Sequence, residues 1–399
     1  MEGRQAEVVV AGHICLDVIP TFGEREGGLE ALLVPGKLVE VGPAVLAPGG
    51  AVSNTGLALH RLGVPTRLMG KVGDDLFGRA ILDVLRQREP ALAEGMIVTE
   101  GEPSSYTLVV NPPGVDRIFF HCPGTNDTFG AGDVADEQVA GARLFHFGYP
   151  PIMRRMYSAE GRELEALLRR VKAHGLTTSL DMAKPDPESD AGRAPWPALL
   201  ARVLPFVDVF LPSLDEILFM LDREHFERMQ WGGSLANALL EAGGLLLREL
   251  SERLLGLGTA VVALKLGDQG LYLRTTGDPD RLADLGEGAP GDPQLWLDRE
   301  LLAPCFKANV VGTTGAGDCT IAGFLAGLLQ GLSPEEVMTA AVAVGACSVE
   351  RADATSGVPA WAAVKRRVQS GWARHGVALA LPGWQWDAAK GIWIGPNDS

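Results

Sequence analysis

The feature of this sequence that most restricts its fold is the alternation of short β-branched runs with longer segments of helical period. The runs include EVVVAGHICLDVI (residues 7–19), TAVVALKL (259–266) and FKANVV (306–311), and GRELEALLRRVKAHG (161–175) is one of the helical segments. Continuous apolar runs indicate strands that are buried on both faces, and helices between them indicate parallel connections. The sequence therefore predicts a doubly wound α/β fold, with a mostly parallel sheet covered by helices on both faces.

Length and charge narrow the function. A chain of 399 residues with 46% hydrophobic residues can bury the core of one large α/β domain with additions, or of two to three smaller units. The net charge of −15 leaves no basic surface for phosphodiester backbones, so we expect no nucleic-acid partner. The N-terminal residues lack the features of a signal peptide, and no apolar run is long enough to span a bilayer. We therefore expect no membrane partner.

The cysteines and histidines indicate neither disulfides nor a metal centre. The five cysteines are an odd number, and none are spaced as C-x-x-C. None of the seven histidines forms an H-x-x-x-H or similar pair, so no role is assigned to them. Free cysteines are typical of a reducing compartment, and we predict a cytoplasmic protein.

Several segments interrupt the alternating pattern. Residues 29–47 and 104–121 show turn signals suited to hairpins, and they could pair as a small β-structure outside the main sheet. Residues 226–257 form a strong helical pattern interrupted by glycine pairs, which indicates an added helix. Five of the eight tryptophans follow residue 360, so we expect the C-terminal tail to pack on the core.

The tetrapeptide Gly-Ala-Gly-Asp occurs twice, and only one copy has the context of an anion-binding turn. Gly315–Asp318 follow a β-branched run and precede CTIAGFLAGLLQG (319–331), an apolar segment without charge. Small residues let successive backbone N–H groups point at an anion, and a helix N-terminus favours negative charge. Gly130–Asp133 lack a preceding strand, so we interpret that copy as a turn in which Asp133 caps a short helix.

The segment TTGAGDCTIAGFLAG (313–327) resembles the C-terminal motif of the ribokinase-like (PfkB) family of carbohydrate kinases. Four further segments are similar to that family in the same order: PGGAVSNTGLALHRLGVPTRLMGKVGDDLFG (48–78), HCPGTND (121–127), LPSLDEI (211–217) and LKLGDQGLYL (264–273). The resemblance implies a ribokinase-like fold with a small β lid. It also implies ATP-dependent transfer of the γ-phosphoryl group to a hydroxyl of a sugar or sugar-like substrate, with Mg²⁺ as cofactor.

The resemblance also implies individual roles. Asp318 would be the general base, at the mouth of a dry cavity, and the N–H groups of Gly315, Ala316 and Gly317 would form the anion hole. The residues expected to bind the sugar are Asp17, Gly49, Gly50, Asn54 and Tyr106. Tyr106 could instead fill the core of the hairpin.

A second group of residues is expected to bind the nucleotide and the metal. Glu216 is the carboxylate expected to act on Mg²⁺ through water. The nucleotide-binding candidates are Lys184, Ser213, Lys265, Gly267 and Gly270. Ser213 stands where the family usually has asparagine, and Lys265 could meet a phosphate as a point charge.

The predicted domain organisation follows from these matches. A kinase domain spans residues 1–375, with lid segments at about 20–47 and 104–124 and a helical insertion at about 226–257. Residues 376–399 form a tryptophan-rich extension. Tyr106 and Arg117 are assigned to the lid, which would exclude water from the sugar and could pair with a second lid in a homodimer.

Gly312 departs from the family pattern. Many relatives carry an aspartate there, which helps hold a monovalent cation beside the anion hole. Glycine offers no carboxylate, so we predict a competent kinase with weak or absent dependence on potassium. Two alternatives remain open at this point: a nucleoside kinase of the same family, and a noncatalytic relative that binds a ligand through the same fold.

Overall fold

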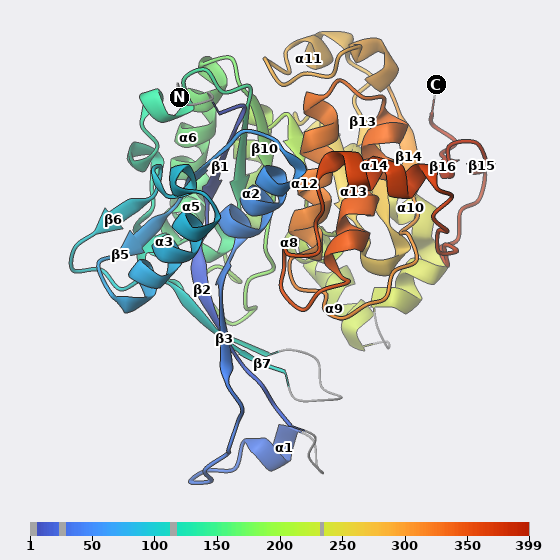
Figure 1. Ribbon diagram of the computed structural model, residues 1–399. Coiled ribbons are helices and arrows are strands. Elements are labelled where there is room, and N and C mark those ends of the chain that lie inside the picture. The colour runs from blue at the N-terminus through green and yellow to red at the C-terminus, as the bar shows by residue number, and fades with distance from the viewer. Residues whose placement is uncertain (1–5, 24–28, 112–117, 232–234, 399) are drawn as a thin grey trace.

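The computed structural model describes residues 6–23, 29–111, 118–231 and 235–398, and its centre is a ten-stranded sheet (Figure 1). Strands β4 (Thr66–Met69), β1 (Val8–Gly12), β9 (Leu144–Gly148), β10 (Thr177–Leu180), β11 (Val209–Phe210) and β12 (Val261–Lys265) pair in parallel in that order. The sheet continues antiparallel through β13 (Leu271–Thr275), β14 (Glu300–Ala303), β16 (Ile392–Ile394) and β15 (Gln385–Asp387). The doubly wound, mostly parallel prediction is confirmed.

Apolar side chains of the central strands alternate between two cores. Val8 and Val10 of β1 belong to one buried cluster, and Val9 and Ala11 belong to the other. Successive side chains of a strand point to opposite faces, so this strand needs an apolar residue at every position. Both faces of the sheet are therefore covered.

Helices supply the other half of each core. One face carries α2 (Ala51–Leu62), α3 (Leu76–Arg88), α12 (Ala316–Leu329), α13 (Pro334–Ser348) and α14 (Trp361–Gln369). The opposite face carries α6 (Arg162–Ala173), α7 (Trp196–Val203), α8 (Leu214–Leu221) and α10 (Leu235–Gly256). The helices α4 (Asp136–Val139), α5 (Arg154–Tyr157), α9 (Arg223–Trp231) and α11 (Pro279–Ala283) lie in the connections.

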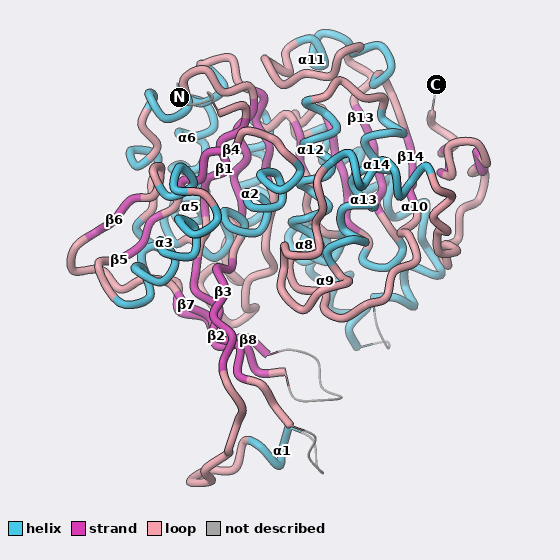
Figure 2. The backbone as a smooth tube through the Cα atoms, in the orientation of Figure 1, coloured by secondary structure: helices cyan, strands magenta, loops and turns pink. Residues whose placement is uncertain are grey.

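A four-stranded sheet, which we call the lid, projects from the main body toward the bottom of the view (Figures 1 and 2). Its strands are β3 (Ala44–Gly49), β2 (Cys15–Pro20), β7 (Tyr106–Val110) and β8 (Ile118–Cys122), paired in that order. The parallel pairing of β2 with β7 joins residues 16–18 to residues 106–108. A further parallel pair, β5 (Lys71–Gly73) with β6 (Ile97–Thr99), lies beside α3 at the left edge of the main body (Figure 1).

The lid is built differently from two self-contained hairpins. Residues 104–121 do contribute the antiparallel pair β7 and β8, whereas residues 29–47 contain the short helix α1 (Leu29–Leu32) and most of β3. The partner of β3 is β2, which comes earlier in the chain. The sequence pattern correctly predicted a turn within residues 29–47. It did not predict that the strand after this turn, β3, pairs with β2. Arg117 lies outside the described residues.

Two additions extend the core. The segment expected as a helical insertion contains most of α9 and all of α10, and α10 packs on β12 and β13. The C-terminal tail supplies β16, which pairs with β14, and Trp384 of the tail packs 6.1 Å from Tyr272 between ring centroids. Among the described helices, none combines the length and apolar composition that crossing a bilayer requires.

Candidate active site

Side chains that follow neighbouring strands gather at the carboxyl edge of the parallel sheet. Tyr149 follows β9, Asp181 follows β10, Ser213 is the third residue after β11 and Lys265 ends β12. The carboxyl ends of parallel strands meet at one edge, and ligands of open α/β sheets bind there. The topology thus brings together residues that are more than a hundred positions apart.

Asp318 lies in the first turn of α12 at this edge and is only 3% exposed. Its helix is apolar around its whole circumference, so it packs between α2 and α13. Gly315 caps the helix with a left-handed backbone (φ 69°), and a Cβ there would lie 2.5 Å from Cβ of Ala354. Only glycine fits this turn without strain, and the turn directs the Asp318 carboxylate into the site.

Three side chains donate hydrogen bonds to Asp318. Nδ2 of Asn54 lies 3.0 Å from Oδ2, and the Thr55 hydroxyl lies 3.4 Å from Oδ1. The Tyr149 hydroxyl lies 2.8 Å from both carboxylate oxygens. Burial raises the pKa of Asp318, while the charge of Lys265 and these hydrogen bonds oppose that shift. The carboxylate therefore combines a raised affinity for a proton with a fixed orientation.

Backbone N–H groups at the start of α12 complete this part of the site. The first N–H groups of a helix have no carbonyl partner within the helix and point toward any anion beyond its end. The N–H of Ala316 makes a long contact of 3.3 Å with the carbonyl of Thr313. Gly317 lies beside Lys265, since a Cβ there would make an ordinary contact of 3.5 Å with Cδ of the lysine.

The second Gly-Ala-Gly-Asp copy forms a turn of 3₁₀ helix over Ala131–Asp133. The Asp133 carboxylate accepts a hydrogen bond from the N–H of Gly130 at 2.7 Å and lies 3.9 Å from Nζ of Lys71. It lines neither of the two cavities that meet at Asp318. The interpretation of this copy as a capped turn is confirmed.

Lys265 is surrounded by carboxylates. Its Nζ lies 2.5 Å from Oδ1 of Asp181, which is 1% exposed, while Oδ2 of Asp181 is buried without a hydrogen-bond partner. Glu216 accepts a hydrogen bond from the N–H of Ser213 at 2.7 Å, at the start of α8. Burial opposes the charge of Lys265, but the carboxylates of Asp181 and Glu216 outweigh it and raise the pKa of the lysine. The cluster contains more carboxylates than cations, an arrangement that favours a further cation.

A cavity of about 740 Å³ lies between Asp318 and the lid, and we call it the lid-side cavity. His13 and Asn54 line it from the core, and Asp17, Thr107 and His121 line it from the lid strands β2, β7 and β8. Nε2 of His13 lies 3.2 Å from Nε2 of His121, and the Thr107 hydroxyl lies 3.0 Å from Nδ1 of His121. The cavity thus presents hydroxyl, imidazole, amide and carboxylate groups to one ligand.

The charges of the lid-side cavity are set by burial. Burial raises the pKa of Asp17 to about 6, against hydrogen bonds from Cys15 and Thr107 that lower it. Burial also lowers the pKa of His13 and of His121, so both imidazoles are neutral at neutral pH. Oδ1 of Asn54 is buried without a partner. The cavity therefore offers the half-buried carboxylate of Asp17 and the open amide oxygen of Asn54, both acceptors for hydroxyl groups.

A second cavity, of about 920 Å³, lies on the other side of Asp318, and we call it the β12-side cavity. Lys265, Gly267, Gly270 and Ser213 line its polar end. Its apolar walls include Phe306, Val310, Val342 and Leu379. Asp318, Tyr149, Glu216 and Gly315 line both cavities, so the two spaces meet at the carboxylate.

The C-terminal segment forms one wall of the β12-side cavity. His375, Ala378 and Leu379 line it, and the N–H of Ala378 donates to Oε1 of Gln269 at 2.7 Å. The N–H of His375 also donates to the carbonyl of Cys305 at 2.8 Å. These bonds attach the wall to the turn that follows β12 and to the segment that follows β14.

The predicted residues do not all lie in these cavities. The Tyr106 ring packs on Phe77 of α3 with 5.1 Å between centroids, and its neighbour Thr107 faces the ligand space instead. Gly49 lies behind Asp17, where a Cβ would be 2.3 Å from Oδ2. Gly50 lines the lid-side cavity directly.

Lys184 lies outside the β12-side cavity that Lys265 lines. It lines the lid-side cavity rather than the β12-side cavity, and its Nζ pairs with Asp215 at 3.3 Å. We therefore assign no nucleotide contact to it.

Sequence reasoning missed Tyr149, Asp181 and the pair of His13 with His121. Tyr149 and Asp181 each directly follow a buried strand, in LFHFGY and TTSLD, and that position was the available signal. The two histidines are 108 residues apart, so no spacing rule could join them.

Comparisons with known proteins agree with this geometry. A family model described as pfkB family carbohydrate kinase matches residues 5–361. An uncharacterized sugar kinase of Archaeoglobus fulgidus is 25% identical over 303 residues, which cover 76% of this chain and 98% of that protein.

Solved structures share the fold. A fructokinase from Xylella fastidiosa with bound ATP has a TM-score of 0.67 and 18% identity, with 92% of this chain and 99% of that chain covered. A putative ribokinase II from E. coli in complex with ATP and Mg²⁺ has a TM-score of 0.65 and 20% identity, with 92% and 100% covered.

Proposed function

The chain belongs to the pfkB family of carbohydrate kinases, and we propose that it transfers the γ-phosphoryl group of ATP to a hydroxyl of a sugar or sugar-like substrate, with Asp318 as general base. The observation that carries this proposal is the position of Asp318, a buried carboxylate at the junction of two cavities. One cavity would hold the hydroxyl that reacts, and the other the phosphoryl donor.

The lid-side cavity suits a sugar. Its volume of about 740 Å³ accommodates a monosaccharide, and its polar groups include Asp17, Asn54 and Thr107. A carboxylate and amide oxygens accept hydrogen bonds from hydroxyl groups, and buried acceptors discriminate against ligands that lack those hydroxyls. Asp17 and Asn54 would hold the sugar in this way, with one hydroxyl directed at Asp318.

The β12-side cavity suits a nucleotide. Gly267 and Gly270 let the backbone approach closely at its polar end, where Lys265 supplies a positive charge for phosphate oxygens. The apolar wall that includes Phe306, Val342 and Leu379 would face the base. The solved relative from Xylella fastidiosa contains ATP, which supports the same donor here.

The chemistry is an in-line displacement at the γ-phosphorus. The substrate O–H bond breaks as its proton passes to the Asp318 carboxylate, the new O–P bond forms, and the bond from the γ-phosphorus to the bridging oxygen breaks to release ADP. Charge builds on the three equatorial oxygens during transfer. The N–H groups of Gly315, Ala316 and Gly317 and the ammonium of Lys265 would stabilise that charge.

The carboxylates near Lys265 fit a magnesium ion. Oδ2 of Asp181 is buried without a partner, and burial raises the pKa of Glu216. Within the described part of the chain, no cluster of three or more histidine, cysteine or acidic side chains could hold a metal ion alone. This agrees with an ion that also needs phosphate oxygens and water. Bound Mg²⁺ would neutralise phosphate charge, and Glu216 with Asp181 would hold it through water.

The lid also supports an assembly proposal. Leu46 on β3 and Phe120 on β8 are each more than half exposed, on the face of the lid opposite Asp17 and Thr107. We propose that these apolar side chains pair with the lid of a second copy, since such patches mark interaction surfaces. Sedimentation of Phe120→Glu beside the wild-type chain tests this: a dimer that the substitution dissociates supports it, and a wild-type monomer contradicts it.

Assay of the purified protein with MgATP against a panel of pentoses, hexoses and nucleosides tests the function. We expect a sugar to be converted to its phosphate ester with one ADP per product. Transfer to nucleosides alone, or ATP turnover that no acceptor increases, would contradict the proposal. In that case the lid-side cavity would bind an acceptor other than a sugar.

A further inference from the structure

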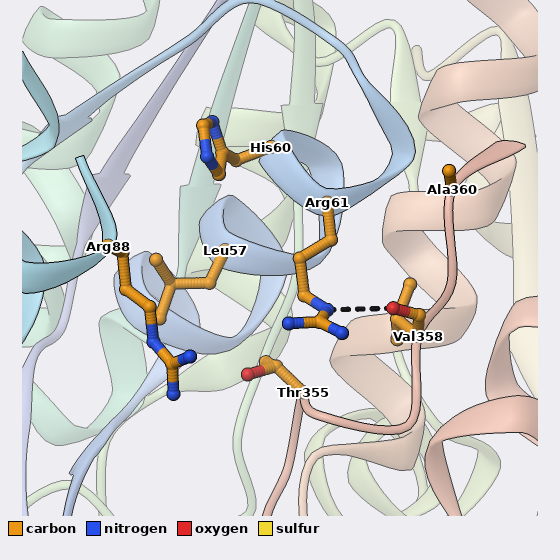
Figure 3. Close-up of a pocket in the computed structure, with 7 residues that line it drawn as sticks. All are labelled: Leu57, His60, Arg61, Arg88, Thr355, Val358 and Ala360. Carbon is orange, nitrogen blue, oxygen red and sulfur yellow. Dashed lines mark hydrogen bonds between the residues drawn. The ribbon is translucent and has the colours of Figure 1, made fainter.

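A third cavity lies away from the active site, between α2, the end of α3 and the loop before α14 (Figure 3). Its volume is about 390 Å³, and Leu57, His60, Arg61, Arg88, Thr355 and Val358 are among the residues that line it. None of its lining residues lines either of the cavities that meet at Asp318. It is therefore a separate site.

Two guanidinium groups face this cavity in an acidic protein. Figure 3 shows the head groups of Arg61 and Arg88 on either side of the Thr355 hydroxyl. Neither arginine has a carboxylate oxygen within 4.0 Å among the residues that the structure describes. The chain has a net charge of −15, and these two arginines share one cavity without a close carboxylate.

The acidic groups around the cavity are already engaged. Glu89 lies 3.4 Å from Nε2 of His60. The Asp353 carboxylate accepts hydrogen bonds from the N–H groups of Thr355 and Ser356 at 3.0 and 2.7 Å, and the charge of Arg88 is one of the influences that lower its pKa. Asp353 therefore shapes the loop, because its oxygens accept hydrogen bonds from the N–H groups of Thr355 and Ser356 and from the Ser356 hydroxyl, and neither guanidinium group lies within 4.0 Å of them.

Arg61 is held in place before any ligand binds. Its Nε lies 2.7 Å from the carbonyl of Val358 and its Nη2 lies 3.0 Å from the carbonyl of Ser356. These bonds fix the plane of the guanidinium while its charge is still not neutralised. A preorganised cation loses little side-chain entropy when an anion binds.

We propose that this cavity is an effector site for a small phosphorylated molecule, whose phosphoryl group pairs with Arg61 and Arg88 and accepts a hydrogen bond from Thr355. Arginine forks match phosphate oxygens, and a hydroxyl adds a neutral donor. The cavity exceeds the size of a phosphate group, and its apolar walls at Leu57 and Val358 leave room for the remainder of the ligand.

The position of the cavity links it to the catalytic turn. The loop that Arg61 holds includes Ala354, whose carbonyl accepts a hydrogen bond from Sγ of Cys319 at 3.1 Å and whose Cβ packs on Gly315. Arg61 also lies on α2, the helix that carries Asn54 and Thr55. An anion that tightens this loop would restrain the turn at Gly315 on one side of Asp318 and the helix α2 on the other. It would thereby change the rate of phosphoryl transfer.

Calorimetric titration with inorganic phosphate and with fructose 6-phosphate tests the site, in the presence of a nonhydrolysable ATP analogue. The informative variant is Arg88→Ala, because Arg88 is exposed and we expect its loss to leave the fold intact. Arg86→Ala is the matched control, since Arg86 is on the same helix and pairs with Asp83 instead. A second variant, Thr355→Val, removes only the hydroxyl.

We expect Arg88→Ala to weaken binding of the phosphorylated probe by about tenfold, as for loss of a charge-assisted hydrogen bond, and Arg86→Ala to bind like the wild type. Thr355→Val should weaken binding by a smaller factor. Tighter binding of fructose 6-phosphate than of phosphate supports a phosphorylated metabolite, and the reverse order assigns the site to the free ion. Equal binding by Arg88→Ala and Arg86→Ala overturns the site.

Kinetics test the effector role separately. We expect the probe to change the rate of ADP formation in wild type and in Arg86→Ala, and to have a weaker effect in Arg88→Ala. Binding that depends on Arg88 but leaves the rate unchanged overturns the effector role. The binding measurement does not depend on the proposed kinase function, so failure of one is distinguishable from failure of the other.

Discussion

The hydroxyl of Tyr149 lies 2.8 Å from each of the two carboxylate oxygens of Asp318. The tyrosine reaches this position from the end of β9 with a left-handed backbone (φ 68°), directly before Pro150 and Pro151. Such a conformation is uncommon for a bulky residue and persists only where its surroundings impose it. The strained residue thus orients the carboxylate that we propose as the base.

Replacing Tyr149 by phenylalanine should shift the acid limb of the pH profile of kcat/KM to higher pH. The lost hydrogen bond is one of the interactions that lower the pKa of Asp318, so without it the carboxylate holds its proton to higher pH. Tyr106→Phe is the control, because Tyr106 lines neither cavity. Superimposable profiles for the two variants would show that Tyr149 does not act on the base.

The affinity for sugar should fall as the pH drops below about 6, where Asp17 gains a proton and its carboxylate stops accepting hydrogen bonds from hydroxyls. The neighbouring His13 and His121 have lowered pKa values and remain neutral there. Calorimetry with the accepted sugar should give a dissociation constant that rises toward acid pH. In Asp17→Asn the sugar should bind more weakly throughout, with a dissociation constant that does not depend on pH between about 5 and 7.

The same substitution should stabilise the fold at high pH. A carboxyl group whose pKa is raised in the folded state binds more protons when folded, so stability falls as pH rises from the unfolded value of 3.8 through about 6. Asp17→Asn removes that loss, and should gain about 1–3 kcal/mol at pH 8 and nothing at pH 3. Urea unfolding at both pH values measures this, and an equal effect at each would refute the assignment.

Activity should not require potassium. Gly312 has no carboxylate, and a Cβ at this position would lie 3.1 Å from the carbonyl oxygens of Arg351 and Ala352, so a larger residue does not fit without a shift. Turnover measured in potassium chloride and in choline chloride at equal ionic strength should agree. A large stimulation by potassium would mean that backbone carbonyls alone hold the cation.

Leu379→Ala should raise KM for ATP. Leu379 is buried in the wall of the β12-side cavity, whereas Leu381 packs nearby on the core and lines neither cavity. Each alanine variant should lose stability, by about 2–5 kcal/mol for the buried Leu379. Only Leu379→Ala should weaken the use of ATP, with KM for sugar unchanged. Equal KM values for ATP in both variants would exclude the C-terminal wall from the donor site.

Much of the fold could be predicted because its signals are local. Apolar residues at every position of residues 8–11 indicate a strand buried on both faces, and β1 has that environment. The turn at Gly315–Asp318 was distinguishable from its duplicate because a β-branched run and an apolar helix flank it, although residues 307–311 form a loop rather than the strand that the run predicted. Both conclusions needed only residues that are close in sequence.

What could not be predicted depends on contacts between distant segments. Tyr149 contacts Asp318 across 169 positions, and Asp181 contacts Lys265 across 84. The side of the lid that faces the ligand depends on strand register, since a shift of one residue exchanges Tyr106 with Thr107. Both faces of β7 carry acceptable residues, so the sequence pattern could not decide between them.

The central claim is that Asp318 removes the proton from the substrate hydroxyl, and its most direct test compares Asp318→Asn with Asp133→Asn, the same change in the duplicate tetrapeptide. Calorimetry first establishes that each variant still binds sugar and ATP. We predict that Asp318→Asn lowers kcat by about 10²–10⁴-fold while Asp133→Asn retains the wild-type kcat. Near wild-type turnover by Asp318→Asn would contradict the account.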